Sequence, residues 1–485
     1  MMMKTTRTRS RSKAVFAAVS ALVLGLGACG GGGDDDGAAG GNGDAGGGAP
    51  ELPDCPVDAL DQATGPVEIE FWHAMVRANK DELERLTKVF NESQTKVRVK
   101  LSESPSYGDN FTRYKSGLAT GALPDLVQIE DTALQQMIDS GSVLPASACV
   151  EADGYDTSDH IERVLAYYTV QDVLWPMPFN VSNPILYYNK SVFRAAGLDP
   201  ESPPGTLEEL RAASQAIVDS GAATYGLAFK TDAWFFEHWT AMSGRPFVNN
   251  GNGRKARATE VLFDDEEGVA QWEWLQGMHR DGLLLSTGDA GFDHFLAVGE
   301  GKAAMTIDTS AALGTIFQVL GSGQYAGVDL GAAPMPGPRS DDGGVLVGGA
   351  ALYIVNRSDP VEQAAAWEFA KFLNEPQRQA EWSAATGYIP IRRSATELAP
   401  ITQAWQARPE LRIAYDQLLS GADNEATAGP VIGAYGSGGG GEGVRGAVVE
   451  GLNSMFVRDL PAAEALAETA RKADERIQEY NDRVG

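Results

Sequence analysis

Hydrophobic spacing that switches repeatedly between the strand and helix periods most restricts how this chain of 485 residues can fold. From residue 66, five segments alternate as strand, helix, strand, helix and strand: 67–72, 80–91, 97–101, 109–120 and 125–129. Strands separated by helices are typical of an α/β fold with a mainly parallel sheet. The length allows two or three domains.

The alternation resumes near residue 181, which indicates a second unit of the same class. Thr206 and Glu209 form a capping box that opens a helix ending near Gly221. Further strands are expected at 185–188, 303–307 and 345–347, and further helices at 265–281, 361–374 and 461–482. We find no internal repeat.

The N-terminus has the pattern of an export signal. Five basic residues within 1–13 precede an apolar run over 14–26, which is shorter than the roughly 20 residues that a spanning helix needs. The run ends in Leu26-Gly27-Ala28-Cys29, which resembles a bacterial lipobox. We therefore expect a lipoprotein signal peptide over 1–28 and lipidation of Cys29; a plain secretory cleavage site is the alternative.

The segment that follows is too poor in apolar residues to fold. Residues 30–53 are mostly glycine, aspartate and alanine, so 29–65 is expected to be a flexible tether. A single lipid chain anchors weakly, so stable membrane attachment would need more than one chain. The sequence thus predicts an exported body held at the outer face of the cell membrane.

Charge and cysteine content exclude some classes of protein. The formal charge is −27, and removing the five basic charges of residues 1–28 takes it to −32, which argues against a nucleic-acid partner. Only three cysteines occur, so the chain is no disulfide scaffold. Outside the membrane the compartment is oxidising, where Cys55 and Cys149 could pair.

Patterns that would indicate catalysis or a bound metal are missing from the sequence. It has no G-x-S-x-G elbow, no H-E-x-x-H and no C-x-x-C, and its five histidines are scattered. The glycine run at 436 lacks the Lys-Ser/Thr of a phosphate loop. We therefore expect no enzyme, no metal and no cofactor; a phosphodiester hydrolase and an adhesive surface lipoprotein are the alternatives from other classes.

Several motifs, in order and spacing, resemble extracellular solute-binding proteins of bacterial ABC importers. The similarity is greatest to the branch that binds glycerol 3-phosphate and glycerophosphodiesters, and it covers nearly all of residues 66–480. The matching positions are residues 71–75, 178–190, 304–306, 348–350, Trp382, 386–390 and Arg445.

The resemblance implies a periplasmic-binding-protein-like fold, in which two α/β lobes close on a ligand. Hinge crossings would lie near 180–184, 305–309 and 348–353. Lobe one would hold 66–180 plus 308–349, and lobe two 181–307 plus 350–485. The partners would be an ABC permease and its ATPase, and the protein would be a monomer.

The resemblance also supplies candidate ligand-binding residues. Asp131 would accept hydrogen bonds from glycerol hydroxyls, unless it is an ordinary helix N-cap or Glu130 takes its place. Residues at the hinge crossings would donate hydrogen bonds to the ligand, unless they only shape the hinge. The further candidates are Tyr107, Ser182, Thr309, Ser310, Gly349 and Tyr388.

Arg445 follows six glycines in "GSGGGGEGVRGA" (436–447) and is the candidate phosphate ligand. Glycines can turn successive N–H groups toward an anion, and a helix begins near this point. A guanidinium there suits a phosphate, although a flexible glycine linker is the alternative.

Two departures from the glycerol 3-phosphate binders favour a larger ligand. Those binders carry two tryptophans, of which only Trp234 remains here, with Trp239 as the competing assignment. They also carry a glutamate where this chain has the shorter Asp131. A choline head group could contact Trp234 through a cation–π interaction. Glycerophosphocholine is therefore the preferred ligand over glycerol 3-phosphate, and an oligosaccharide is the alternative.

Overall fold

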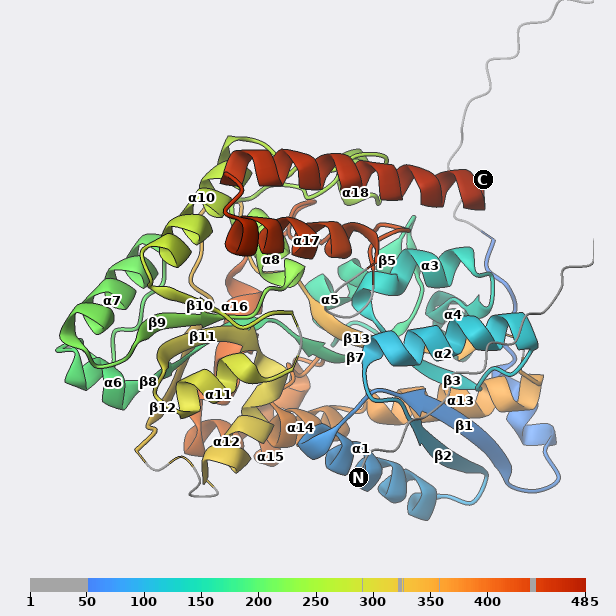
Figure 1. Cartoon of the computed structure of the whole chain (residues 1–485). Helices are drawn as coiled ribbons and strands as arrows, with labels where there is room; N and C mark the ends of the chain where they lie inside the picture. The colour runs from blue at the N-terminus through green and yellow to red at the C-terminus, as the bar shows by residue number, and fades with distance from the viewer. Residues whose placement is uncertain (1–50, 290, 322–324, 326, 357, 437–441) are drawn as a thin grey trace, which may run out of the picture. The chain divides into compact units, whose positions relative to one another are not determined.

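The computed structural model describes residues 51–485, except 290, 322–324, 326, 357 and 437–441 (Figure 1). The expected signal peptide, the lipidation of Cys29 and the first part of the tether lie outside these residues. In the described part of the chain, no helix has the length and apolar character needed to cross a membrane.

The first sheet is mixed rather than purely parallel. Its order is β2-β1-β3-β13-β4, and β7 also pairs with β13. β1 runs parallel to β2 and β3, whereas β13 is antiparallel to β3, β4 and β7. The strands are β1 (Val67–His73), β2 (Val97–Glu103), β3 (Leu126–Glu130), β4 (Val143–Leu144), β7 (Met177–Ser182) and β13 (Gly348–Val355).

Amphipathic helices bury their apolar faces on this sheet. α1 (Arg77–Ser93) buries Leu83, Leu86 and Phe90 at helical spacing, as the sequence predicts. α13 (Pro360–Leu373) packs on β1 and starts with a capping box from Asp359. The remaining helices whose residues join this core are α2 (Tyr107–Thr120), α3 (Leu134–Asp139), α4 (Ala146–Asp153), α5 (Glu162–Tyr168), α12 (Leu313–Gly321), α14 (Pro376–Thr386), α15 (Ala399–Ala407) and α16 (Ile413–Ser420).

The second sheet has the order β10-β9-β11-β8-β12 and a separate core. Its strands are β8 (Pro184–Asn189), β9 (Tyr225–Phe229), β10 (Leu284–Ser286), β11 (Ala303–Thr309) and β12 (Leu330–Pro334). Its helices are α6 (Lys190–Ala195), α7 (Leu207–Ser220), α8 (Ala233–Met242), α9 (Asn249–Asn252), α10 (Glu266–Arg280), α11 (Asp293–Gly299), α17 (Gly443–Arg458) and α18 (Ala462–Val484). The predicted capping box at Thr206 is present.

Short elements complete the chain: β5 (Thr169–Val170) pairs with β6 (Val173–Leu174), and five 3-10 helices cover η1 (Val57–Gln62), η2 (Asp131–Ala133), η3 (Ser310–Ala312), η4 (Ser394–Glu397) and η5 (Pro409–Arg412). The strand expected at 345–347 is absent; the strand begins at Gly348 instead.

Each sheet with its core is one lobe, and the chain crosses between lobes more often than expected. β7 and β8 meet at Asn183, in the first expected crossing. However, β12 joins the second sheet, and β13 with α13–α16 joins the first lobe. The expected division into 308–349 for lobe one and 350–485 for lobe two is therefore wrong in these segments. Periodicity gives an element's type but not the sheet that it enters.

The folded body begins before residue 66. Cys55 and Leu60 are buried against the first core, and η1 packs on α13. A disulfide joins Cys55 to Cys149 in α4, the pairing that the sequence allowed. Residues 55–62 are therefore ordered, unlike the flexible tether expected over 29–65, because apolar contacts and the disulfide hold them.

Candidate functional site

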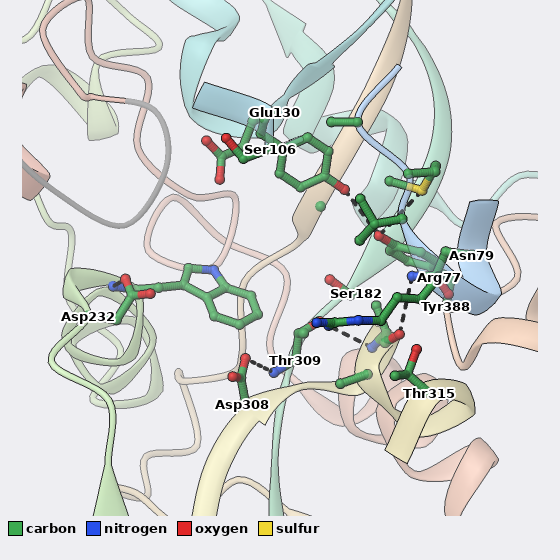
Figure 2. A pocket seen from close by; sticks show the side chains of 18 of the residues that line it. Arg77, Asn79, Ser106, Glu130, Ser182, Asp232, Asp308, Thr309, Thr315 and Tyr388 are labelled. Atoms are coloured by element: carbon green, nitrogen blue, oxygen red, sulfur yellow. Dashed lines mark hydrogen bonds between the residues drawn. The ribbon is translucent and has the colours of Figure 1, made fainter. Parts of the chain in front are cut away.

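A cavity of about 340 Å³ lies where the two lobes meet. All predicted ligand-binding residues except Ser310 line it: Tyr107, Asp131, Ser182, Trp234, Thr309, Gly349, Tyr388 and Arg445. Figure 2 shows labelled side chains from both lobes, among them Glu130, Asp232, Asp308, Arg77 and Tyr388, arranged around this space.

Ser310 does not line the cavity. It is fully buried, and its backbone N–H donates to the carbonyl oxygen of Asn183 at the lobe crossing. Its role in ligand binding, expected from the resemblance, is not supported because the chain turns into η3 at this residue.

Tyr107 and Tyr388 form a polar pair in the first lobe. Their hydroxyl oxygens are 3.1 Å apart, and the Asn180 side chain donates to the Tyr107 hydroxyl at 2.8 Å. The Tyr388 ring stacks on Trp382, with ring centroids 5.4 Å apart. Burial raises the pKa of both phenols, so both remain neutral donors at physiological pH.

Asp131 is a buried carboxyl group whose pKa is strongly shifted. Burial, opposed by Arg445, raises its pKa to about 7, and the Tyr167 hydroxyl donates to it at 2.8 Å. The N-cap of η2 is Glu130, which makes no capping side-chain bond, so Asp131 is not an ordinary N-cap. Glu130 and Asp131 both line the cavity.

Arg445 lies in the first turn of α17 with 6% of its surface exposed. Its Nε and Nη2 donate to the two carboxylate oxygens of Glu237 at 2.8 and 2.6 Å, and Nη1 lies 3.7 Å from Glu130 Oε1. The bidentate edge expected to hold a phosphate is therefore bound to Glu237. The glycines at 438–441, expected to form an anion nest, lie outside the described residues.

Glu237 was missed by the sequence analysis, although a signal existed. It is the single acid in α8, a helix rich in aromatic residues, where it lies between Phe236 and His238 and is 1% exposed. A buried carboxylate requires a partner. Burial would lower the pKa of Arg445, but Glu237 outweighs this effect and raises it.

Two further acid–base pairs at the cavity were also missed. Lys230 lies 2.9 Å from Asp232, and the Asp308 carboxylate accepts a bond from His294 at 2.5 Å. Burial would raise the pKa of Asp232, yet Lys230 and Arg445 lower it. Burial would likewise raise the pKa of Asp308, but His294 and Lys230 lower it, so both carboxyls are ionised.

The structure distinguishes the two candidate tryptophans. Trp234 lines the cavity, and its ring packs edge-to-face with His238 at 4.9 Å. A side-chain carbon at Gly348 would lie 2.7 Å from the indole, so this glycine leaves room for it. Trp239 is fully buried and donates to the carbonyl of Pro336. Trp234 is therefore the available aromatic face.

The crossing residues have structural roles as well as cavity positions. Gly349 has φ +106°, and a side-chain carbon there would lie 2.1 Å from the Asn180 carbonyl oxygen, so only glycine fits. The Thr309 hydroxyl accepts from the Ala311 N–H and caps η3. Ser182 pairs with Gly348 between β7 and β13. Hinge geometry thus accounts for these positions even without a ligand.

Among residues 51–485, gaps excepted, no group of three or more His, Cys, Asp or Glu side chains is placed to hold a metal ion. The arrangement suits ligand recognition: hydroxyl donors, an aromatic face and charges of both signs surround one partly open cavity between two lobes. A fold and cavity of this kind define a two-lobed ligand-binding protein.

Residues 85–412 match the family of bacterial extracellular solute-binding proteins, and this chain belongs to that family. The sn-glycerol-3-phosphate-binding periplasmic protein UgpB of Salmonella typhimurium is 30% identical over 369 residues, which cover 74% of this chain and 82% of the relative. The protein of that name from Rhizobium meliloti is 28% identical, and the match covers 76% of this chain and 85% of the relative.

Solved structures share the fold at lower identity. UgpB from Mycobacterium tuberculosis in complex with glycerophosphocholine has a TM-score of 0.70 and 21% identity, covering 87% of this chain and 99% of that chain. The cyclic alpha-maltosyl-1,6-maltose binding protein from Arthrobacter globiformis has a TM-score of 0.66 and 22% identity, covering 86% and 100%. The expected two-lobed periplasmic-binding-protein-like fold is thereby confirmed.

Proposed function

We propose that this protein is the membrane-tethered substrate-binding lipoprotein of an ABC importer and binds a glycerophosphodiester, preferably glycerophosphocholine, between its lobes. The observation that carries the proposal is the mixed charge of the cavity wall. Three cationic side chains and four carboxyl groups line it: Arg77, Lys230, Arg445, Glu130, Asp131, Asp232 and Asp308. A zwitterionic ligand can pair with the cationic and the carboxylate side chains at the same time.

The charge balance favours a diester over a monoester. Glu237 neutralises much of the Arg445 charge, so the site offers a phosphate less net positive charge than an unpaired arginine would. Glycerol 3-phosphate carries up to two negative charges and would face the nearby carboxylates. A phosphodiester carries one, and a choline head group would meet those carboxylates and Trp234 favourably.

The relatives' names supply independent support at the level of chemical class. Both relatives are named for binding sn-glycerol 3-phosphate, and one structural neighbour holds glycerophosphocholine. Other neighbours bind sugars, and the carboxyls and Trp234 would also suit an oligosaccharide, which is the second candidate. The relatives are binding proteins, in agreement with a non-enzymatic role.

Calorimetric titration of the protein from residue 30 onward tests the ligand. We expect glycerophosphocholine to bind more tightly than glycerol 3-phosphate, and maltose not to bind. Tight binding of maltose with no binding of either glycerol compound would replace the proposal with the sugar alternative.

The tether is tested separately in cells. We expect a Cys29→Ser variant to lose incorporation of labelled fatty acid and to leave the membrane fraction, while a Cys55→Ser variant keeps both properties. Membrane retention of the Cys29→Ser protein would contradict the lipid anchor. The family implies an ABC permease and its ATPase as partners, and the anchored body would deliver ligand to them.

A further inference from the structure

A second, apolar cavity of about 180 Å³ adjoins the candidate site. We call it the annex. It shares Arg77, Phe292 and Thr315 with the polar cavity, so the two volumes meet along one wall. Its other lining residues are mostly aromatic or aliphatic: Tyr187, Phe295, Leu296, Val298, Gly299, Ile316, Val319, Tyr325, Val328 and Leu330.

The annex lies between the two lobes, as the polar cavity does. α11 and β8 of the second lobe form one wall, and α12 with the start of α1 in the first lobe forms the other. The Arg77 guanidinium lies 4.0 Å from the centre of the Phe292 ring, at the boundary of the two cavities. The polar group of Tyr187 is already used, since its hydroxyl donates to the Thr309 carbonyl at 2.6 Å.

The rim of the annex exposes an unusual amount of apolar side chain. Phe292, Leu296 and Val319 are 39%, 41% and 38% exposed, and they are half of the large apolar side chains that are exposed in the described part of the chain. Apolar residues gathered at a concave surface indicate a binding site, whereas singly scattered ones need no explanation. Phe292 also lines the polar cavity, so the apolar rim continues from it, an arrangement that suits one ligand with two chemically different ends.

We propose that the annex receives a short acyl chain, so that the site accepts monoacyl glycerophosphodiesters as well as deacylated ones. This inference rests on the proposed function, because the polar cavity must hold the phosphodiester. A volume of 180 Å³ accommodates about six groups of the size of a water molecule, at about 30 Å³ each. A methylene group is similar in size, so the annex suits a chain of about six carbons.

Titration with glycerophosphocholine and with its 1-butanoyl and 1-hexanoyl esters tests this proposal. Each methylene that becomes fully buried is expected to raise affinity by up to about fourfold. We expect the hexanoyl ester to bind at least about tenfold more tightly than glycerophosphocholine. If glycerophosphocholine binds and the esters bind no more tightly, the annex proposal is overturned and the proposed function stands. If none of the three binds, both fall.

Variants at the rim of the annex test whether the gain in affinity from the acyl chain arises there. Leu296→Asp places a charge at the annex, and we expect it to remove most of the hexanoyl gain while leaving glycerophosphocholine affinity within twofold. Leu296→Met should keep the gain. Val457→Asp is the matched control, because Val457 is 81% exposed and does not line the annex. Equal effects of Leu296→Asp and Val457→Asp on ester binding would overturn the proposal.

Discussion

Two arginines at the meeting of the lobes, Arg254 and Arg445, have opposite surroundings. The Arg254 guanidinium donates to backbone carbonyls alone, those of Ala166, Tyr167, Thr169, Ala428 and Gly429. Burial lowers the pKa of Arg254 to about 10. Arg445 instead lies among carboxylates, which raise its pKa.

The difference separates a structural clamp from a group that faces the cavity. Carbonyls from α5 and from the loop before α17 use the donors of Arg254, and it does not line the cavity. Arg445 lines the cavity and is held there by Glu237. The carbonyls bound by Arg254 hold separate chain segments together. Arg445 and Glu237 instead balance each other, and removing either would leave an uncompensated buried charge.

The largest expected effect is that of Arg445→Ala. We expect loss of glycerophosphocholine binding by more than about a hundredfold and destabilisation of about 3–5 kcal/mol, because Glu237 is left buried without its partner. Calorimetry and urea unfolding measure the two effects. The double variant Arg445→Met, Glu237→Leu should recover much of the stability but none of the binding; recovered binding would remove Arg445 from the site.

Arg254→Met should affect stability alone. Leaving several buried carbonyl groups without donors is expected to cost about 3 kcal/mol, while ligand affinity changes less than about threefold. Urea unfolding and titration on the same sample check both. A loss of affinity as large as that of Arg445→Ala would break the distinction between the two arginines.

Glu237→Gln sharpens the charge argument at Arg445. Without the carboxylate, the guanidinium charge is less balanced, so affinity for glycerol 3-phosphate should rise by about tenfold relative to that for glycerophosphocholine. Glu273→Gln, an exposed change on α10, is the matched control and should alter neither ligand. An unchanged ratio for Glu237→Gln would show that this acid does not set ligand charge.

Asp131 gives the smallest expected effect on ligand affinity, together with a defined pH dependence of stability. Its pKa of about 7 lies above the ordinary value of 3.8, so the folded protein holds a proton that the unfolded chain has lost between these values. Stability from this group is therefore fully present below about pH 4, falls as pH rises to about 7, and is then constant. Asp131→Asn should flatten this part of the stability–pH profile measured by urea unfolding.

Binding should show the opposite trend. Ligand hydroxyls donate to the ionised carboxylate, so we expect affinity to rise by about threefold between pH 6 and pH 8. Titration of the Asp131→Asn variant should show no such rise. A wild-type affinity that is flat over this range would argue against hydroxyl binding at Asp131.

The elements were more predictable from sequence than the lobes. Residues 67–72 and 97–101 were identified as strands from period-two spacing, and 125–129 as a buried-type strand; both signals are local. The placement of β13 in the first sheet depends on pairing with β3 and β7, which lie far away in sequence. No local pattern carries that information, so β12, β13 and α13–α16 were assigned to the wrong lobes.

Most of the predicted site residues line the cavity, but several of its charged residues were not predicted. The resemblance identified Arg445 and Trp234, and both line the cavity. It did not identify Glu237, whose partner Arg445 lies in another helix, or Lys230, whose pairing with Asp232 depends on side-chain conformation. An isolated acid inside an aromatic helix was the one available signal, and it showed only that a partner was needed.

The disulfide between Cys55 and Cys149 determines which part of the fold carries a force applied to the N-terminal segment. It crosslinks residues 94 positions apart, so tension on the chain before Cys55 passes into α4 and the first lobe without first peeling η1 away. The N-terminal segment of the described chain is therefore fixed to the first lobe, and a change in the angle between the lobes would leave its point of attachment unmoved.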